Sequence, residues 1–408
     1  MNKQALIDRV HKIAKEAEIP FNECWKQLLL ERFLARLSLS EYSDKFIFKG
    51  GFLLSYMMEI GRETIDLDFL LTKMNASEKE IEDAIQRIAS IALEDGFSFL
   101  YETLEFLEQP HMDYPGYRVI LRAAFSNMKD KIQIDVGIGD IVKPVERDFH
   151  FFEYRGKPIF EREISLLVYP PETIFAEKLE TVLSKGSINS RMKDYHDLVL
   201  LIRNPTLIQQ DNLKAAITNT FQNRRTIFEL IVFDEDELKR IQKLWTAHFQ
   251  SLGKKGKDLG LPKNIQEIIR EINSYLVKMS LISLGNIVAE LSGKKMLEQV
   301  QAAIIAGADV NDNSRNGHRS LQMALKEGYS EVARLLIEGG ADVLYCDHSG
   351  LNPLQMAINY GQFENANLLI EKGAPFNPNN LQGYHYPRLY QFQHFGRNQI
   401  WLKRKPNS

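Results

Sequence analysis

The stretch at residues 45–71 constrains the fold more than any other part of the chain. Residues 46–48 form a short apolar run rich in β-forming side chains, and a pair of glycines follows shortly after it. Residues 52–60 are apolar enough for about two turns of helix, and residues 65–69 alternate between apolar and acidic side chains. The stretch therefore predicts a strand, a glycine turn, a helix and a second strand.

The acidic side chains of the second predicted strand share one face. Asp66 and Asp68 are two residues apart, so both point to the same side of a strand, opposite Leu67. Neighbouring carboxylates repel each other unless a cation lies between them, and oxygen ligands of this kind suit Mg²⁺ or Mn²⁺. The strand therefore predicts a divalent-metal site.

The glycine turn before the helix suits phosphate. Gly50 and Gly51 open the predicted helix, where free backbone N–H groups and the positive end of the helix dipole favour an anion. No Gly-Lys-Ser or Gly-Lys-Thr follows, so the turn is not a Walker loop. A phosphate site one strand away from a metal site indicates nucleotide binding, to which we also assign Lys49.

A third carboxylate lies on a later predicted strand. Residues 131–138 place four isoleucine or valine side chains on one face and leave Asp135 on the polar face. A lone carboxylate on a strand is usually only solvated. Asp135 nevertheless fits as a third metal ligand beside Asp66 and Asp68, and we include it in the predicted site.

Length, charge and cysteine usage narrow the class of protein. The 408 residues are too many for one compact core, so two or three domains are expected. A net charge of -3 gives no overall basic field, and no DNA partner is expected. The two cysteines lie in opposite halves, which favours a reducing, cytoplasmic compartment. We expect neither a membrane span nor a secretory signal peptide.

The middle of the chain reads as a helical region. Lys178 lies on a helix predicted from Pro171 to about residue 184, and the motif Lys-Asp-Tyr-His-Asp at residues 193–197 lies on the next helix. Taken alone, this motif is more typical of an exposed, charged turn than of a site. His196 lacks further ligands at a recognised spacing, so we interpret it as structural. The Gly- and Lys-rich residues 251–263 are the best candidate for a linker.

A repeat occupies the last third of the chain. Gly-Ala recurs every 33 residues, at Gly307, Gly340 and Gly373. A helix, a glycine, a second helix ending in paired leucines and a turn fill each period, which resembles ankyrin repeats. Two complete units follow an incomplete one. So few units are marginal alone, so we expect them to pack on a helix at residues 264–283. We interpret the aromatic tail at residues 384–405 as a cap rather than a docking peptide.

Four motifs, taken in order, resemble the AbiEii/AbiGii toxin family of nucleotidyltransferases. They are KGGFLLSYMMEIGRETIDLDF, IQIDVGI, PETIFAEKLE and RMKDYHDL, and the resemblance covers roughly residues 20–250. It implies an α+β fold, with a polymerase-β-like nucleotidyltransferase domain of the minimal type and a helical subdomain, followed by an α-helical ankyrin-repeat domain. The implied divisions are 1–164 for the core with its N-terminal helices, 165–250 for the helical subdomain that completes the nucleotide site, 251–291 for a linker and helix, and 292–408 for the repeats and tail.

The resemblance also implies roles for individual residues. Metal binding and catalysis would fall to three carboxylates, Asp66, Asp68 and Asp135. The family's helix lysine matches Lys178, and its Lys-Asp pair matches Lys193 and Asp194; these three would also be catalytic. The nucleotide would contact the glycine turn, both lysines and two polar residues before the paired acids, namely Lys49, Gly50, Gly51, Arg62, Thr64, Lys178 and Lys193. The spacing between Gly51 and Asp66 is long for the general fold but common in this subgroup.

The expected function is metal-dependent nucleotidyl transfer. A nucleoside triphosphate would be the substrate, Mg²⁺ or Mn²⁺ the cofactor, and a protein or an RNA the acceptor. Ankyrin repeats would recruit a protein target, and an antitoxin partner is typical of the toxin family. Ankyrin repeats on such a domain also suggest an effector translocated into a eukaryotic host cell. The alternative is an ankyrin adaptor with an inactive nucleotide-binding domain, which the intact acids argue against.

Overall fold

The computed structural model describes residues 3–107, 116–150, 152–160, 163–314 and 316–376, with the backbone alone at 390–394 and 400–404. The chain divides into two compact units. The first unit comprises Met1–Phe228 and Lys243–Lys263, and the second comprises Glu229–Gln242 and Asn264–Ser408. None of the described helices is long and apolar enough to cross a bilayer.

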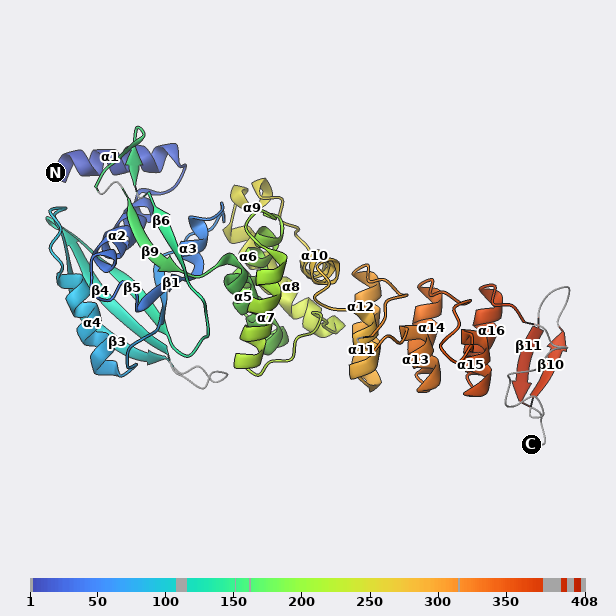
Figure 1. Cartoon of the computed structure of the whole chain (residues 1–408). Helices are drawn as coiled ribbons and strands as arrows, with labels where there is room; N and C mark the ends of the chain where they lie inside the picture. Colours follow the sequence, from blue (N-terminus) through green and yellow to red (C-terminus); the bar gives the residue numbers. More distant parts are fainter. Residues whose placement is uncertain are drawn as a thin grey trace. The chain divides into compact units, whose positions relative to one another are not determined.

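A mixed sheet forms the centre of the first unit (Figure 1). Its described strands run in the order β3-β4-β5-β2-β1-β9-β6. Their bounds are β1 Phe46–Lys49, β2 Asp66–Leu71, β3 Phe97–Leu107, β4 Gly116–Phe125, β5 Met128–Gly137, β6 Val145–Phe149 and β9 Ile164–Val168. β2 pairs antiparallel with β1 but parallel with β5, and β1 pairs parallel with β9. A separate hairpin joins β7 (Glu153–Tyr154) to β8 (Lys157–Pro158).

The alternation predicted for the acidic strand is confirmed. In β2, Leu67 and Phe69 are fully buried, while Asp66 and Asp68 are half-buried on the opposite face. The predicted strands at residues 46–48 and 131–138 are also present, within one to three residues at their ends. Neither β6 nor β9 was predicted, although β9 forms one wall of the core through Leu166 and Val168.

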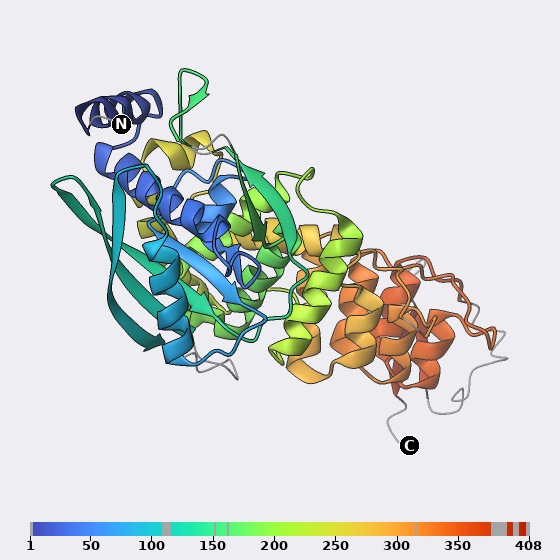
Figure 2. The ribbon, with the colours of Figure 1, turned by 60° about the vertical axis from the view of Figure 1, so that its left-hand side comes forward.

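Helices α2 (Phe21–Ser38) and α4 (Glu78–Ser90) pack side by side against the sheet (Figure 2). α2 follows α1 (Lys3–Glu16), and Pro20 is the residue that caps its start. Trp25 of α2 contacts the rings of Phe97 and Phe125, with centroid distances of 5.9 and 6.1 Å. Ser77 caps the start of α4, because its side chain accepts a hydrogen bond from the Glu80 N–H. The helix ends at Ser90, because Ile91 adopts an extended conformation.

A helical layer completes the first unit. Its helices are α3 Gly50–Ser55, α5 Pro171–Lys185, the short 3₁₀ turn Gly186–Ile188, α6 Met192–Ile202, α7 Gln210–Asn223 and α9 Lys254–Asp258. α5 packs against both α6 and α7. α8 (Glu235–Ser251) starts in the second unit and ends in the first. α3 is shorter than the helix predicted to residue 60, because the chain turns after Ser55.

The segment at residues 251–263 is folded rather than extended. Gly253, at φ +58°, separates α8 from the short helix α9. The indole N–H of buried Trp245 then donates to the Pro262 carbonyl at 2.9 Å. The composition of residues 251–263 suggests a linker. In the structure, however, the glycines and lysines of this segment form turns and the exposed face of a short helix.

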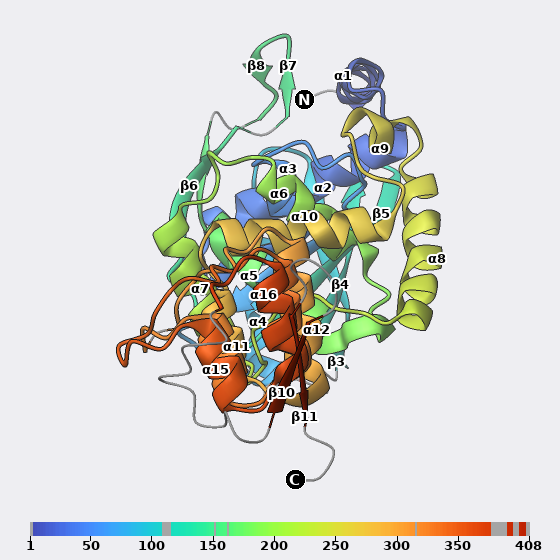
Figure 3. The same ribbon diagram turned by 90° about the vertical axis from the view of Figure 1, so that its right-hand side faces the viewer.

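The described part of the second unit is helical up to residue 376 (Figure 3). Its helices are α10 Ile265–Lys278, α11 Leu284–Glu290, α12 Gly293–Ile305, α13 Ser320–Lys326, α14 Ser330–Glu338, α15 Pro353–Asn359 and α16 Phe363–Glu371. They form the pairs α11/α12, α13/α14 and α15/α16, and α10 packs on α12 as expected. The first pair, α11 and α12, begins at Leu284, before the start at residue 292 that the sequence predicted. The first repeat, which was predicted to be incomplete, therefore has both of its helices. Most of the tail at 384–405 lies outside the described residues; strands β10 (Tyr390–His394) and β11 (Ile400–Arg404) pair antiparallel within it.

Candidate active site

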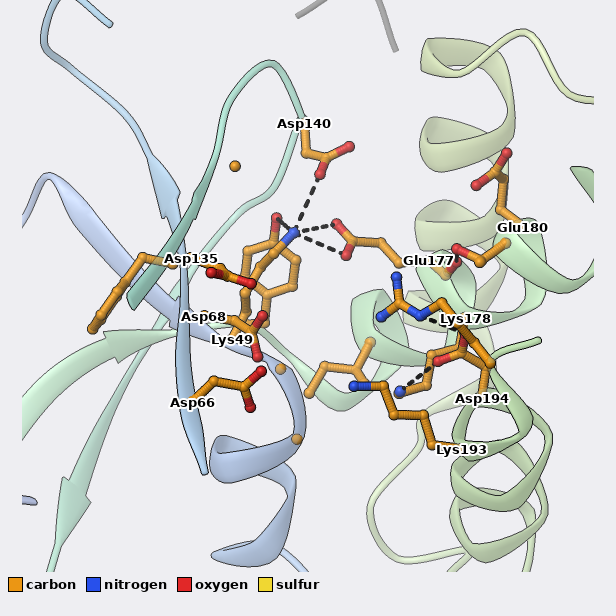
Figure 4. Close-up of a pocket in the computed structure, with 18 of the residues that line it drawn as sticks. Lys49, Asp66, Asp68, Asp135, Asp140, Glu177, Lys178, Glu180, Lys193 and Asp194 are labelled. Atoms are coloured by element: carbon orange, nitrogen blue, oxygen red, sulfur yellow. Dashed lines mark hydrogen bonds and ion pairs between the residues drawn. The ribbon is translucent and has the colours of Figure 1, made fainter. Parts of the chain in front are cut away.

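Three carboxylates meet where β2 lies beside β5. The parallel register places Asp68 opposite Asp135, and Asp66 lies two residues earlier on the same face of β2. One oxygen from each of Asp66, Asp68 and Asp135 lies within 4.8 Å of the others. Figure 4 shows the three side chains converging on one side of the sheet. The structure thus brings together the three acids that the sequence singled out.

The electrostatics of this cluster fit a divalent cation. Burial raises the pKa of the Asp68 carboxyl to about 6, and repulsion from Asp66 and Asp135 adds to the rise. Among the described residues, neither Asp66 nor Asp68 makes an ion pair. Three clustered carboxylates with so little compensating charge are the oxygen-rich donor set that Mg²⁺ or Mn²⁺ takes.

Asp135 differs from the other two acids because an arginine holds it. The Arg118 guanidinium on β4 donates from Nε to Asp135 Oδ1 at 2.8 Å and from Nη2 to Oδ2 at 2.7 Å. β4 pairs antiparallel with β5, and the register places Arg118 directly opposite Asp135. The sequence analysis missed Arg118, since only the strand register reveals the pairing.

The two glycines of the turn are required by the atoms around them. Gly50 has φ +82°, and a Cβ built there would lie 1.9 Å from Asp68 Oδ2. A Cβ on Gly51 would lie 2.8 Å from Arg62 Nη2. Thr64 is buried behind this turn, where its methyl group would meet a Gly51 side chain at 3.1 Å. The glycines therefore let the backbone approach the acids closely.

Gly50→Ala should strongly reduce the rate of the nucleotidyl transfer expected from the sequence, without unfolding the protein. The new methyl group would displace the Asp68 carboxylate, for which we expect a loss on the order of a hundredfold in rate. Strain from the positive φ adds about 1–2 kcal/mol of destabilisation. Gly156→Ala is the matched control, because Gly156 has φ +69° but no atoms within 4 Å of a new Cβ. Equal rates for both variants would contradict the role given to Gly50.

Lys49 is placed beside the acids but is already paired. Its Nζ lies 3.1 Å from Glu177 Oε2, 3.3 Å from Asp140 Oδ2 and 3.5 Å from the Tyr169 hydroxyl (Figure 4). Arg224 of the loop after α7 pairs with the same Asp140 at 3.0 Å. Lys49 therefore links the acidic face of the sheet to a mixed-charge cluster of Glu177 on α5 with Asp140 and Arg224 from loops. The sequence analysis did not detect this cluster.

A second buried cluster holds Lys178 and Arg62. Lys178 Nζ lies 3.0 Å from Asp194 Oδ1 and 2.7 Å from Asp197 Oδ2. Arg62 binds both oxygens of Asp197, at 3.0 and 2.7 Å. Asp194, His196 and Asp197 are all buried, so the expectation of an exposed, charged turn at this motif is wrong. Apolar side chains beside the motif are buried in the core on more than one face of α6. Asp194 and Asp197, which lie between them on the helix, are therefore buried as well.

His196 pairs with a second histidine. Its Nδ1 lies 2.9 Å from His248 Nε2, and burial lowers the pKa of His196 to about 4. The His196 ring is therefore neutral at physiological pH, which agrees with its interpretation as structural.

Two lysines face the acids without a described partner. Lys185 and Lys193 line the same pocket of about 510 Å³ as the three carboxylates, and neither makes an ion pair with a described residue. Figure 4 shows Lys193 reaching from α6 toward the carboxylates. Arg191 also lines the pocket, 3.4 Å from Asp194. The three carboxylates of the sheet thus share a pocket with a helical side of mixed charge, on which Lys185 and Lys193 are the lysines without an ion pair to a described residue.

Asp68→Asn should stabilise the metal-free protein near neutral pH. A pKa of about 6, above the ordinary 3.8, means that the protonated Asp68 stabilises the fold at low pH and that this contribution is lost as the pH rises through 6. At pH 7 with a chelator, we expect the variant to unfold with about 1–2 kcal/mol more free energy than wild type. The difference should vanish near pH 4 in urea titrations.

The exposed Asp258→Asn variant serves as the control for this comparison. It should unfold like wild type at both pH values. A metal-free Asp68→Asn protein no more stable than wild type at pH 7 would contradict the raised pKa of the Asp68 carboxyl.

A mixed sheet with clustered carboxylates, completed by helices that carry lysines, is the architecture of a nucleotidyltransferase domain. The family described as "Nucleotidyl transferase AbiEii toxin, Type IV TA system" matches residues 32–271, and ankyrin repeats in three copies match residues 287–380. The chain therefore belongs to the AbiEii nucleotidyltransferase family and carries ankyrin repeats after that domain.

A comparison with solved structures gives a match to an H. pylori protein described provisionally as a nucleotidyltransferase. The identity is 13%, the TM-score is 0.30, and the match covers 64% of this chain and 95% of the other. No curated protein matches this chain.

Proposed function

We propose that the first unit transfers a nucleoside monophosphate from a nucleoside triphosphate to a hydroxyl group of a macromolecule. The observation that carries this proposal is the single pocket in which Asp66, Asp68 and Asp135 face Lys193 and Lys185. The acids provide oxygen ligands, and the lysines provide positive charge for phosphate oxygens at the far side of the same pocket.

The reaction would be an in-line displacement. The acceptor hydroxyl gives its proton to water, and its oxygen forms a bond to the α-phosphorus. The bond from that phosphorus to the bridging oxygen breaks, and pyrophosphate leaves with that oxygen and the bonding electron pair. Asp66, Asp68 and Asp135 would hold the divalent ions. A bound cation would neutralise phosphate charge, including the charge that develops on the leaving pyrophosphate.

The chain's own residues would position the substrate. Gly50 and Gly51 leave room for a phosphate close to Asp68. Lys193 would contact the triphosphate as a point charge. Asp194 and Asp197 hold the Lys178 ammonium group through ion pairs. Lys178 would therefore provide a positive charge at a fixed position on the helical side of the pocket. Lys49 and Arg62 would act in the same way, since carboxylates also hold them.

The second unit would select the acceptor. Ankyrin repeats bind proteins on their exposed surfaces, so they would recruit either a protein acceptor or a protein that delivers an RNA. Arg191, Lys185 and Lys193 at the pocket would also suit an RNA 3′ end, whose phosphates favour basic side chains. An adaptor with an inactive domain is less well supported, because all three carboxylates are present and clustered.

Incubation with α-labelled nucleoside triphosphates, Mg²⁺ and cell lysate tests this proposal. We expect label in a macromolecule, and digestion with protease or ribonuclease then identifies the acceptor as protein or RNA. A parallel reaction uses a variant in which residues 284–376 are deleted and the three acids are kept. The difference in label transfer between this variant and the full chain measures the contribution of the repeats. Absence of label in every fraction, with all four nucleotides, would favour the adaptor function instead.

A further inference from the structure

The three carboxylates of the site are not equivalent. Both oxygens of Asp135 accept hydrogen bonds from the Arg118 guanidinium, at 2.8 and 2.7 Å. Asp66 and Asp68 make no ion pair with any described residue. Gln133, two residues before Asp135, places its amide oxygen 3.1 Å from Arg118 Nε when the amide faces the guanidinium. Two side chains of β5, Asp135 and Gln133, therefore hold Arg118 of β4 in place.

The two parallel hydrogen bonds from Arg118 to Asp135, referred to below as the fork, weaken the binding of any cation that uses Asp135 as a ligand. Each carboxylate oxygen already accepts a charge-assisted hydrogen bond, which is stronger than a neutral one. A cation placed at Asp135 also stands close to the fixed positive charge of Arg118, and two positive charges at short range repel strongly in a partly buried pocket. The pair Asp66–Asp68 carries no comparable penalty.

We propose that Arg118 makes the filling of the site ordered. In the free protein, one divalent cation binds at Asp66 and Asp68, while Arg118 keeps Asp135 closed to a second. The second cation enters only with the nucleoside triphosphate, whose negative charge offsets Arg118. This inference rests on the proposed function, because it assumes that the three acids form the metal site.

Arg118 is thus a positioning residue that acts through Asp135. Its effect would be to prevent a fully metal-loaded pocket from forming before the nucleotide arrives. A purely structural role, as a cross-strand ion pair between β4 and β5, predicts something different. Removing a structural pair changes stability but not the number of cations bound.

Titration of the full-length protein with Mn²⁺, followed by the electron paramagnetic resonance signal of free Mn²⁺, separates the two roles. Wild type should bind one ion alone and two with a triphosphate analogue that carries a methylene between the α- and β-phosphorus. Arg118→Gln should bind two ions without the analogue. Its second site should tighten about tenfold, which corresponds to about 1.4 kcal/mol of repulsion removed.

Arg122→Gln is the matched control for this titration. Arg122 lies on the same strand and face as Arg118, but it pairs with Glu102, with Nε 2.6 Å from Oε1, and does not line the pocket. This variant should bind Mn²⁺ like wild type. Arg118→Lys keeps the charge while losing the fork, so its second site should still need the nucleotide.

Several outcomes would overturn the inference. Arg118→Gln with the wild-type number and affinity of ions would reduce Arg118 to a structural residue, as would a wild type that binds two ions without nucleotide. An Arg118→Lys protein that binds two ions alone would contradict the role of the charge. If wild type binds no Mn²⁺ even with the analogue, the proposed function fails together with this inference, whereas the other results leave the proposed function standing.

Discussion

Asp66→Asn should abolish nucleotidyl transfer and leave the protein folded. Asp66 is half-buried, lies on strand β2 and makes no ion pair with a described residue, so replacing its carboxylate by an amide of the same shape breaks no ion pair among those residues. It does remove a carboxylate from the cluster that would hold the metal. Losing such a ligand should lower the rate by on the order of a thousandfold or more, as removal of a preorganised charge-stabilising group does.

The measurement is the rate of label transfer from an α-labelled triphosphate at saturating Mg²⁺, with thermal unfolding recorded alongside. Asp130→Asn is a suitable control, because Asp130 lies on β5 with Asp135 but pairs with Lys26 outside the pocket. It should keep the wild-type rate. An Asp66→Asn protein as active as wild type would remove Asp66 from the site.

Asp197→Asn should be the most destabilising single change in the first unit that we consider. Asp197 is fully buried and accepts hydrogen bonds from both Arg62 and Lys178. A neutral amide would leave these two buried cations short of compensating charge, which typically costs about 3–5 kcal/mol. Urea unfolding at pH 7 should therefore show a much lower midpoint for the variant. Asp44→Asn, which breaks the exposed pair with Lys73, should cost less than about 1 kcal/mol.

The lowered pKa of Asp197 determines how the stability difference between wild type and Asp197→Asn changes with pH. Burial opposes ionisation, but Lys178 and Arg62 hold the pKa of Asp197 well below its usual range. A lowered pKa means that the stabilisation is complete above the unfolded value near 3.8 and is lost as the pH falls below it. The gap between wild type and Asp197→Asn should therefore narrow only below about pH 4. An Asp197→Asn protein with the wild-type midpoint at pH 7 would show that the cluster is not structural.

Sequence patterns were sufficient where the signal is local. The two-residue spacing of Asp66 and Asp68 fixes a shared strand face, and the apolar neighbours of Asp135 fix the next strand. The 33-residue period likewise defines the ankyrin repeats without any tertiary information. In each case the periodicity itself determines which side chains lie together.

The missing features all depend on pairing between distant segments. Arg118 meets Asp135 only because β4 and β5 pair in one particular register. Asp197 looks like part of an exposed, charged motif until α6 is packed in the core beside Arg62, which comes from a loop 135 residues earlier. The ion pairs of Lys49 with Glu177 and Asp140 also join segments that are far apart in the sequence. A sequence shows which charges are present, whereas the fold decides which of them neutralise one another.

The central claim is that the carboxylate pocket transfers a nucleotide and not a phosphate. Parallel reactions with α-labelled and γ-labelled forms of the same triphosphate, with Mg²⁺ and lysate, test it most directly. The account predicts label in the acceptor only from the α-labelled form, γ-label released as pyrophosphate, and loss of both with a chelator or with Asp66→Asn. Transfer of the γ-label to the acceptor, with the α-label left on a nucleoside diphosphate, would contradict it.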